Sequence, residues 1–110
     1  MTTEDRLSSA FAALADSTRR NILHRLRNGS MTVSELAAHY PISRPAVSQH
    51  LAVLERAGLV ERNRRAQWSE CSVARDSLDE VAAWIEQQRT AWNERIDRLD
   101  DYLAKEQSHE

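Results

Sequence analysis

The sequence predicts a mostly α-helical domain that carries one small β-hairpin, and three observations support this prediction. Apolar residues recur at steps of three and four in several segments, a spacing typical of helices that bury one face. Residues 68–73 instead alternate with period two, which is typical of a strand. With 110 residues, of which 41% are hydrophobic, the chain has room for one compact core and no separate catalytic domain.

Capping residues and a glycine divide the first thirty residues into two helices. The first helix ends near Ala15, and its apolar positions are Leu7, Phe11 and Leu14. Asp16 or Ser17 then caps a second helix, whose apolar positions are Ile22, Leu23 and Leu26. We expect this helix to stop at Asn28-Gly29, because glycine adopts the left-handed conformation of a helix end without strain.

Two further helices follow, joined by a short turn. Thr32 and Glu35 have the spacing of a capping box, and the helix that they open extends to about Tyr40, where the following proline stops it. Ser43 is a good N-cap for the next helix. The inward positions of that helix are Val47, Leu51 and Leu54, and Gly58 ends it. This arrangement is typical of a helix-turn-helix.

The hairpin follows Gly58. Leu59 and Val60 open the first strand, an arginine-rich stretch follows, and the second strand alternates up to Val73. The tip lies near Arg64–Gln67 and lacks the Asn-Gly or Asp-Gly pair of a tight turn, so the pattern leaves the register open. A helix-turn-helix followed by such a hairpin is a winged helix-turn-helix.

A long helix is predicted for the C-terminal third. Ser77 to Glu80 have the form of a capping box. The apolar positions beyond it are Leu78, Val81, Ile85, Trp92, Ile96, Leu99 and Leu103. A helix that continues to Lys105 is roughly 43 Å long, whereas a compact domain of this size has a radius of gyration of about 13 Å. Its far half therefore needs a partner subunit, which makes it a C-terminal dimerisation helix.

Charge is divided unevenly along the chain. The net charge is -2, but residues 17–73 hold nine arginines against four glutamates, a net of +5. Residues 74–110 hold five basic and ten acidic side chains, a net of -5. A basic middle section is typical of a DNA-binding surface, although solvated helix faces can give the same pattern.

Candidate DNA-reading residues lie on the fourth helix. Arg44, Ser48 and Gln49 fall opposite its apolar positions, and these side-chain types form hydrogen bonds with base edges in the major groove. The arginines of the hairpin can contact the DNA backbone or the minor groove, and they are Arg62, Arg64 and Arg65.

The run LADSTRRNIL, followed by MTVSELAAHYPISRPAVSQHLAVLERAGLVERNRR, resembles the arsenic-repressor (ArsR) family of bacterial winged-helix regulators. The resemblance extends from about Phe11 through the hairpin and, more loosely, through the last helix. It implies a homodimeric transcription repressor that binds a palindromic, inverted-repeat operator, often that of its own operon. The DNA-binding residues that it implies are Ser43, Arg44, Ser48, Gln49, His50, Arg64 and Arg65.

The resemblance also implies that two segments of the chain have different functions. Residues 1–74 form the DNA-binding core, and residues 75–110 form the dimerisation helix and tail of the same structural domain. The terminal helices join the two subunits. The interface residues that we expect are Leu7, Phe11, Ile85, Trp92, Ile96 and Leu99.

The sequence departs from the metal-sensing members of that family. The positions of their Cys-x-Cys pair hold Thr32 and Ser34, and there is no histidine between Asp76 and Leu103. We therefore expect no metal and no other cofactor. The usual glycine at the tip of the wing is also missing.

The single cysteine, Cys71, excludes an internal disulfide. A strand cysteine is more often a small core residue than a redox switch. The remaining metal hypothesis requires Cys71 and a histidine to meet across the dimer.

The sequence argues against two further function classes. The chain has no phosphate-binding glycine loop and no pair of nucleophile and base, which argues against an enzyme. A module that only binds other proteins through its long helix would leave the polar face of the fourth helix without a role.

The first twenty residues lack the features of a secretion signal, and no apolar stretch is long enough to span a membrane, so we expect a cytoplasmic protein.

Overall fold

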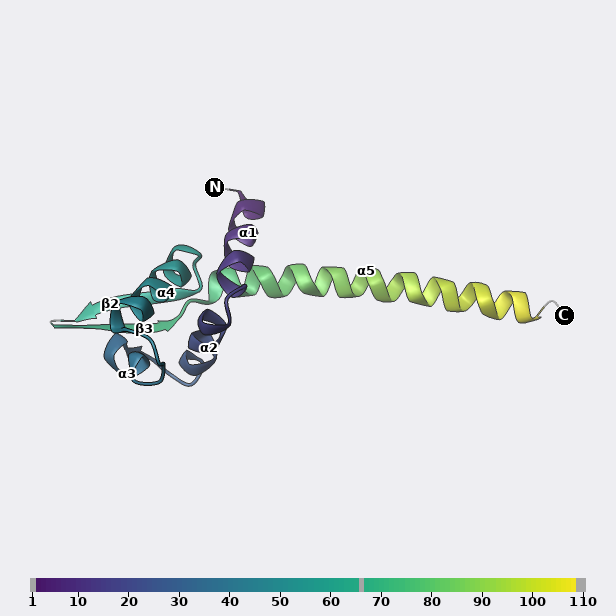
Figure 1. Cartoon of the computed structure of the whole chain (residues 1–110). Coiled ribbons are helices and arrows are strands. Elements are labelled where there is room, and N and C mark those ends of the chain that lie inside the picture. The colour runs from purple at the N-terminus through teal and green to yellow at the C-terminus, as the bar shows by residue number, and fades with distance from the viewer. Residues whose placement is uncertain (1, 66, 109–110) are drawn as a thin grey trace.

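A computed structural model describes residues 2–65 and 67–108, and the side chains of residues 65 and 108 lie outside this description. A small head, formed by the elements from α1 to β3, is followed by one long helix that projects from it (Figure 1). The elements are α1 (Thr3–Leu14), α2 (Ser17–Leu26), β1 (Met31–Thr32), α3 (Val33–Ala37), α4 (Arg44–Arg56), β2 (Val60–Arg65), β3 (Trp68–Val73) and α5 (Arg75–Ser108).

Side-chain caps begin α2, α3 and α4 where the sequence predicts them. Asp16 caps α2 by accepting a hydrogen bond of 3.0 Å from the backbone N–H of Arg19. The capping box of Thr32 and Glu35 opens α3. Ser43 caps α4, with its hydroxyl 3.2 Å from the backbone nitrogen of Ala46. These caps satisfy N–H groups that the first turn of a helix leaves without partners.

The third helix is shorter than predicted. It ends at Ala37, and the next residues form turns in which His39 donates to Leu36 and Tyr40 donates to Ala37 through the backbone. These bonds span three residues, so the last turn tightens before the proline rather than continuing as an α-helix. The Tyr40 hydroxyl donates to Asn21 Oδ1 at 2.7 Å, which ties this turn to α2.

The predicted capping box at the start of α5 is wrong. The helix begins at Arg75, so Ser77 lies within its first turn and is buried. The hydroxyl of Ser77 fills the space beside Gly58, which has a φ of +76°. Only Ala74 separates β3 from α5, and its N–H donates to the Leu59 carbonyl at 2.9 Å.

The sheet has three antiparallel strands in the order β1-β3-β2. The hairpin was predicted, and its register runs from Val60 opposite Val73 to Arg65 opposite Trp68. Strand β1 was not predicted, because two residues carry no periodic pattern. It pairs Met31 with Cys71 and so anchors the base of the wing to the start of α3.

The core lies between the helices of the head and the base of the wing. The predicted inward positions of α4, which are Val47, Leu51 and Leu54, are fully buried. They meet Ile22 from α2 and Leu36 from α3 in one continuous cluster. This packing leaves the opposite face of α4 at the surface.

Helix α5 leaves the head after its first turns. It has 34 residues, which corresponds to roughly 51 Å, and the protomer measures 76 × 31 × 21 Å. The radius of gyration is 20.3 Å, against about 13 Å for a compact domain of this length. The far part of α5 therefore has no part of its own head to pack against (Figure 1).

Candidate nucleic-acid interface

The outward face of α4 carries three of the predicted DNA-binding residues. Arg44 and Gln49 are exposed, and Ser48 is half-buried. The opposite face of the same helix is buried in the core, and this packing holds the backbone of these three residues in place. Such a surface is suited to base readout, because hydrogen-bonding side chains project from a fixed frame.

Ser43 has a structural role at the N-terminus of the same helix. Its side-chain oxygen accepts from the Ala46 N–H and thereby caps α4. The residue is exposed, so its hydroxyl hydrogen can still donate outward. Ser43 therefore lies on the predicted surface but is also engaged in holding the helix.

The wing is joined to α4 by a side-chain hydrogen bond. Arg62 of β2 donates through Nη2 to the Ser48 hydroxyl at 3.2 Å, and both residues are half-buried. Arg62 lies opposite Cys71 in the hairpin register. This contact places a guanidinium beside a predicted base-reading hydroxyl.

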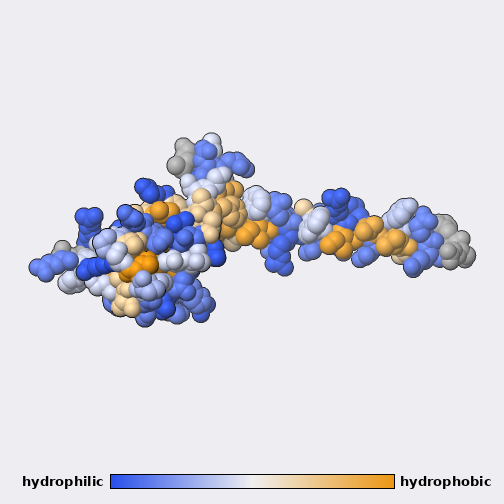
Figure 2. Space-filling model, viewed as in Figure 1, coloured by the Kyte–Doolittle hydropathy of each residue, from blue (hydrophilic) through white to orange (hydrophobic). Residues whose placement is uncertain are grey.

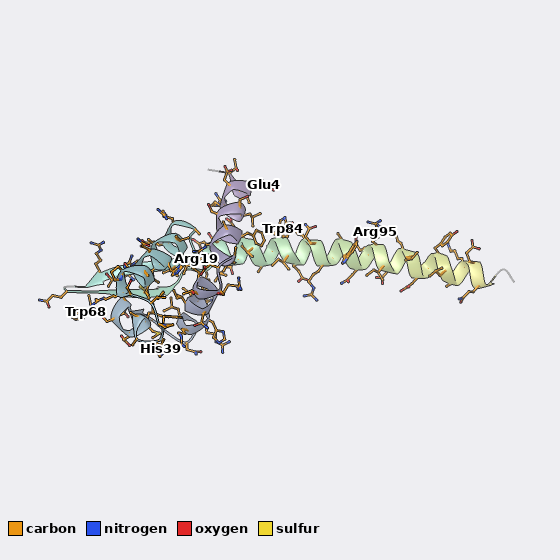
Figure 3. The ribbon with its side chains drawn as sticks, in the orientation of Figure 1. Glu4, Arg19, His39, Trp68, Trp84 and Arg95 are labelled. Carbon is orange, nitrogen blue, oxygen red and sulfur yellow. The ribbon has the colours of Figure 1, made fainter. Side chains whose placement is uncertain are left out.

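A hollow of about 330 Å³ lies between the first turns of α4 and the wing. Arg44, Ser48 and Arg62 line it, together with Trp68 from β3. Figure 3 labels Trp68 toward the end of the wing, and its side chain is 52% exposed. The sequence reading did not assign this tryptophan to the DNA-facing side, since an alternating strand pattern does not say which face meets α4.

The two predicted wing residues, Arg64 and Arg65, lie at the end of β2. Arg64 lies opposite Ser69 and is exposed. The backbone of Arg65 pairs with Trp68 at the end of the hairpin, but its side chain lies outside the description.

His50 is held on the α2 side of α4 rather than on the outward face. Its Nδ1 lies 3.4 Å from Nη1 of Arg19 and 3.9 Å from a carboxylate oxygen of Asp16. Arg19 also donates to the carbonyl of Ala13 at 2.6 Å, and it is labelled in Figure 3 near the junction of the helices. His50 therefore connects α4 to α1 and α2, whereas Gln49 is exposed on the outward face of α4.

The charge at this junction is stabilised by hydrogen bonding. The backbone N–H of Arg19 lowers the pKa of the Asp16 carboxyl, and the nearby charges of His50 and Arg19 act in the same direction. An ionised Asp16 is the better cap, because its oxygen accepts from the positive end of α2.

Five of the six predicted interface residues lie on one exposed apolar surface. Phe11 stands edge-on against Trp84, with ring centroids 5.5 Å apart, where α1 crosses α5. Most of this surface runs along α5 (Figure 2), where the exposed members of the predicted set are Ile85, Trp92, Ile96 and Leu99. Leu7 is the exception, because it is 8% exposed and belongs to the core of its own head.

The predicted set of interface residues omits other members of that surface. Trp84 lies in its first part, and Tyr102 lies near its end, with 59% of its side chain exposed. Tyr102 continues the helical spacing of the stripe, so its position could have been found from periodicity.

Cys71 lies in the core, as expected for a strand cysteine. Its side chain is fully buried, and burial raises the pKa of its thiol. This position gives it no path to a ligand across a dimer, which counts against the metal hypothesis that requires it. Among the described residues, no group of three or more His, Cys, Asp or Glu side chains is placed to hold a metal ion.

None of the described helices is both long and apolar enough to cross a membrane.

Residues 16–62 match the family described as bacterial regulatory protein, arsR family. The transcriptional repressor SdpR of Bacillus subtilis is 34% identical over 79 residues, which cover 72% of this chain and 88% of SdpR. An ArsR-like transcriptional regulator from Rhodococcus sp. RHA1 has a similar structure, with a TM-score of 0.80, 32% identity, and coverage of 96% of this chain and 98% of that one.

A third comparison concerns the fold alone. A winged helix-turn-helix DNA-binding domain from Mycobacterium bovis, described as homodimeric and as a possible ArsR-family regulator, matches with a TM-score of 0.62 and 24% identity. The match covers 82% of this chain and 81% of that one. Together with the geometry of α4 and the wing, the matches to the family, to SdpR and to the Rhodococcus regulator show that the chain belongs to the arsR family of bacterial regulatory proteins and is a DNA-binding transcriptional regulator rather than an enzyme.

Proposed function

We propose that this regulator is a homodimeric repressor that binds an inverted-repeat operator, controls its own operon and acts in the cytoplasm without a metal. The observation that carries this proposal is the coexistence of two surfaces on one protomer. One is the polar outward face of α4 beside the wing, and the other is the uncovered apolar stripe of α5.

The DNA-binding surface has a separate chemistry on each of its parts. Arg44 can donate two hydrogen bonds to guanine, and Gln49 can pair with adenine in the same bidentate way. Arg64 on the wing supplies positive charge that attracts phosphate groups regardless of sequence. We therefore assign sequence choice to α4 and salt-dependent affinity to the wing, with Ser43 and His50 as supports of α4.

The apolar stripe supports pairing with a second copy of the chain. Ile85, Trp92, Ile96, Leu99 and Leu103 follow one another at steps of seven, four, three and four, and all of them are at least 43% exposed. This spacing places them on one side of a helix, as in the seam of a coiled coil. In this proposal residues 1–74 bind DNA and residues 75–110 join the subunits, the last two of these residues lying outside the described part.

A two-fold dimer has a direct consequence for the operator. Two symmetric copies of α4 must enter successive major grooves on one side of the duplex, about 34 Å apart. The matching DNA is an inverted repeat with half-sites one helical turn apart. A dimer on such a site at its own promoter blocks access of the polymerase, which is the simplest form of autoregulation.

The test is fluorescence anisotropy with a labelled duplex from the region upstream of the chain's own gene. A scrambled duplex of the same composition is the control, and both are titrated at several salt concentrations. We expect tight binding to the upstream duplex alone, and a fall in affinity with rising salt that reflects the phosphate contacts. Transcription in vitro from the same promoter should decrease when the protein is added.

Three results would each overturn the proposal in whole or in part. Equal binding to both duplexes would remove sequence-specific recognition of this promoter. No binding to either duplex at low salt would remove DNA from the account, and α5 would then be examined as a surface for another protein. A rise in transcription on binding would replace repression by activation while leaving the DNA site in place.

A further inference from the structure

The hydrogen bond between the wing and α4 has a chemical consequence for base recognition. Arg62 donates through Nη2 to the Ser48 hydroxyl at 3.2 Å. A serine hydroxyl has one hydrogen to donate and two lone pairs that accept. One lone pair is occupied by a charged donor, while the hydroxyl hydrogen remains available for another group.

The guanidinium also restricts what the second group can be. A further donor, such as the amino group of cytosine or adenine, would bring a partly positive hydrogen beside the positive charge of Arg62. An acceptor is favoured by the same charge, since the Arg62 bond polarises the hydroxyl and strengthens its hydrogen as a donor. The acceptors that the major groove offers are purine N7, guanine O6 and thymine O4.

Arg62 is held in place by the sheet rather than by DNA. It lies opposite Cys71, which is fully buried, and Cys71 also pairs with Met31 of β1. The side chain of Arg62 is half-buried and lines the hollow between α4 and the wing. The three-stranded sheet therefore fixes the backbone from which Arg62 reaches Ser48, and the Arg62–Ser48 bond is present in the head without DNA.

We propose that Arg62 is a specificity-determining positioning residue: it commits Ser48 to donate, so that Ser48 selects a base with a major-groove acceptor. This inference rests on the proposed DNA-binding function of the α4 face. It assigns to a wing arginine a part in sequence choice, in addition to the phosphate attraction that wing arginines supply.

The experiment begins with selection of duplexes from a random pool by the wild-type protein. In the enriched duplex, each purine is replaced in turn by its 7-deaza analogue, which removes the N7 acceptor and keeps base pairing. Each thymine is replaced in turn by cytosine, and each guanine by adenine, with the paired base changed to match, which removes the O4 or O6 acceptor. The dissociation constant is measured by anisotropy for the wild type and for Ser48→Ala, Arg62→Met and Arg64→Met.

The Ser48→Ala variant locates the position that Ser48 reads. For the wild type we expect a loss of about fivefold when one acceptor is removed from one half-site, the size of one hydrogen bond. Ser48→Ala should lose sensitivity at that position and keep it elsewhere. Arg62→Met should also lose sensitivity there, and should accept an amino group at the same position.

Arg64→Met is the matched control, because Arg64 lies two residues along the same strand and has no bond to Ser48 among the described contacts. It should weaken binding to every duplex and keep the wild-type pattern. If Arg62→Met is poorly folded by circular dichroism, Arg62→Gln, whose side chain is shorter, replaces it. Arg62→Lys, which keeps a charged donor, should keep the wild-type pattern.

The outcomes are distinguishable. A wild-type pattern in Arg62→Met, or a uniform loss on all duplexes, would overturn the inference while leaving the proposed function standing. A wild-type pattern in Ser48→Ala would overturn it as well, since Ser48 would then read no base. Failure of the wild type to enrich any sequence would overturn the proposed function, and this inference with it.

Discussion

At the scale of single residues, the structure separates side chains that face outward from those that hold the frame. Gln49 and His50 are neighbours in the sequence, yet Gln49 is exposed while His50 lies against Arg19 and Asp16. A helix turns by about 100° per residue, so adjacent positions serve different surfaces. In the proposed function, contact with DNA and support of α4 are therefore divided between neighbouring residues.

Gln49→Ala should weaken binding to the selected duplex by about 1 to 3 kcal/mol, because a bidentate contact with a base is lost. Affinity for random DNA should stay within error of the wild type. Anisotropy titrations on both duplexes check this result. Arg64→Ala serves as the comparison, since it should weaken both duplexes alike. An equal loss on random DNA for Gln49→Ala would show that this side chain does not read a base.

Asp16 should make stability depend on pH in the acid range. Its pKa is lowered in the folded state, chiefly by the Arg19 backbone N–H, from the ordinary value of 3.8. A carboxyl with a lowered folded pKa stabilises the fold above its unfolded pKa, and this contribution is lost as pH falls through the folded value. We expect a steeper loss of the free energy of unfolding below about pH 4 than in Asp16→Asn, which keeps the cap but does not titrate.

Urea unfolding from about pH 6 to about pH 2, at one protein concentration, measures this difference. Parallel curves for the wild type and Asp16→Asn would refute the role given to Asp16. The Asn variant is the appropriate comparison because its side-chain oxygen can accept the same backbone hydrogen bond.

At the scale of elements, the junction between α4, the wing and α5 depends on a close contact at Gly58. This residue has a φ of +76°, and a methyl group added to it would collide with the Ser77 hydroxyl. The end of α4 and the first turn of α5 therefore approach more closely than a side chain at position 58 would allow. The contact also explains why Ser77 is buried within α5 rather than serving as its cap.

Gly58→Ala should destabilise the fold by about 1 to 3 kcal/mol, since it adds both left-handed backbone strain and the collision with Ser77. Ser77→Ala in the same chain should recover part of this loss, because it removes the colliding hydroxyl and leaves the strain. Chemical denaturation of the two single variants and the double variant measures the coupling. A Gly58→Ala stability within about 0.5 kcal/mol of the wild type would contradict the contact.

At the scale of the whole molecule, the long helix leaves a single protomer with an apolar stripe that its own head does not cover. The first turns of α5 are covered by α1, through Phe11 against Trp84 and an ion pair of 3.1 Å between Arg6 and Glu80. Beyond them the apolar stripe is exposed over much of the helix (Figure 2). A monomer would leave this surface in water, and the symmetric dimer that we propose would cover it while placing two heads on one duplex.

Ile96→Glu should shift the protein from dimer to monomer, because burial of a carboxylate in an apolar seam is unfavourable. Analytical ultracentrifugation over a range of protein concentrations measures this change. Gln87→Glu is the matched control, since position 87 is exposed and lies two and a half turns from Ile96, on the opposite face of α5. A dimer of unchanged strength in Ile96→Glu would exclude this stripe as the interface.

The monomeric variant should also bind an inverted repeat more weakly than the wild type, with an affinity close to that for a single half-site. The head does not need the far part of α5 for its own core, so circular dichroism should show a folded variant. These two results together would separate loss of pairing from loss of the fold.

Local patterns in the sequence determined most of the elements and the candidate residues of this protein. The caps at Asp16, Thr32 and Ser43, the inward face of α4, the hairpin and the apolar stripe of α5 all follow from spacing that involves near neighbours. Near-neighbour spacing is visible in a sequence because helices and strands repeat with fixed periods.

The tertiary structure alone decided contacts between residues that are far apart in the chain. Strand β1 exists only because β3 lies beside it, and Ser77 became a core residue because Gly58 faces it. The same is true of His50, which meets Arg19 of α2, and of the bond from Arg62 to Ser48. No periodic pattern encodes these contacts, since each one depends on how whole elements pack together.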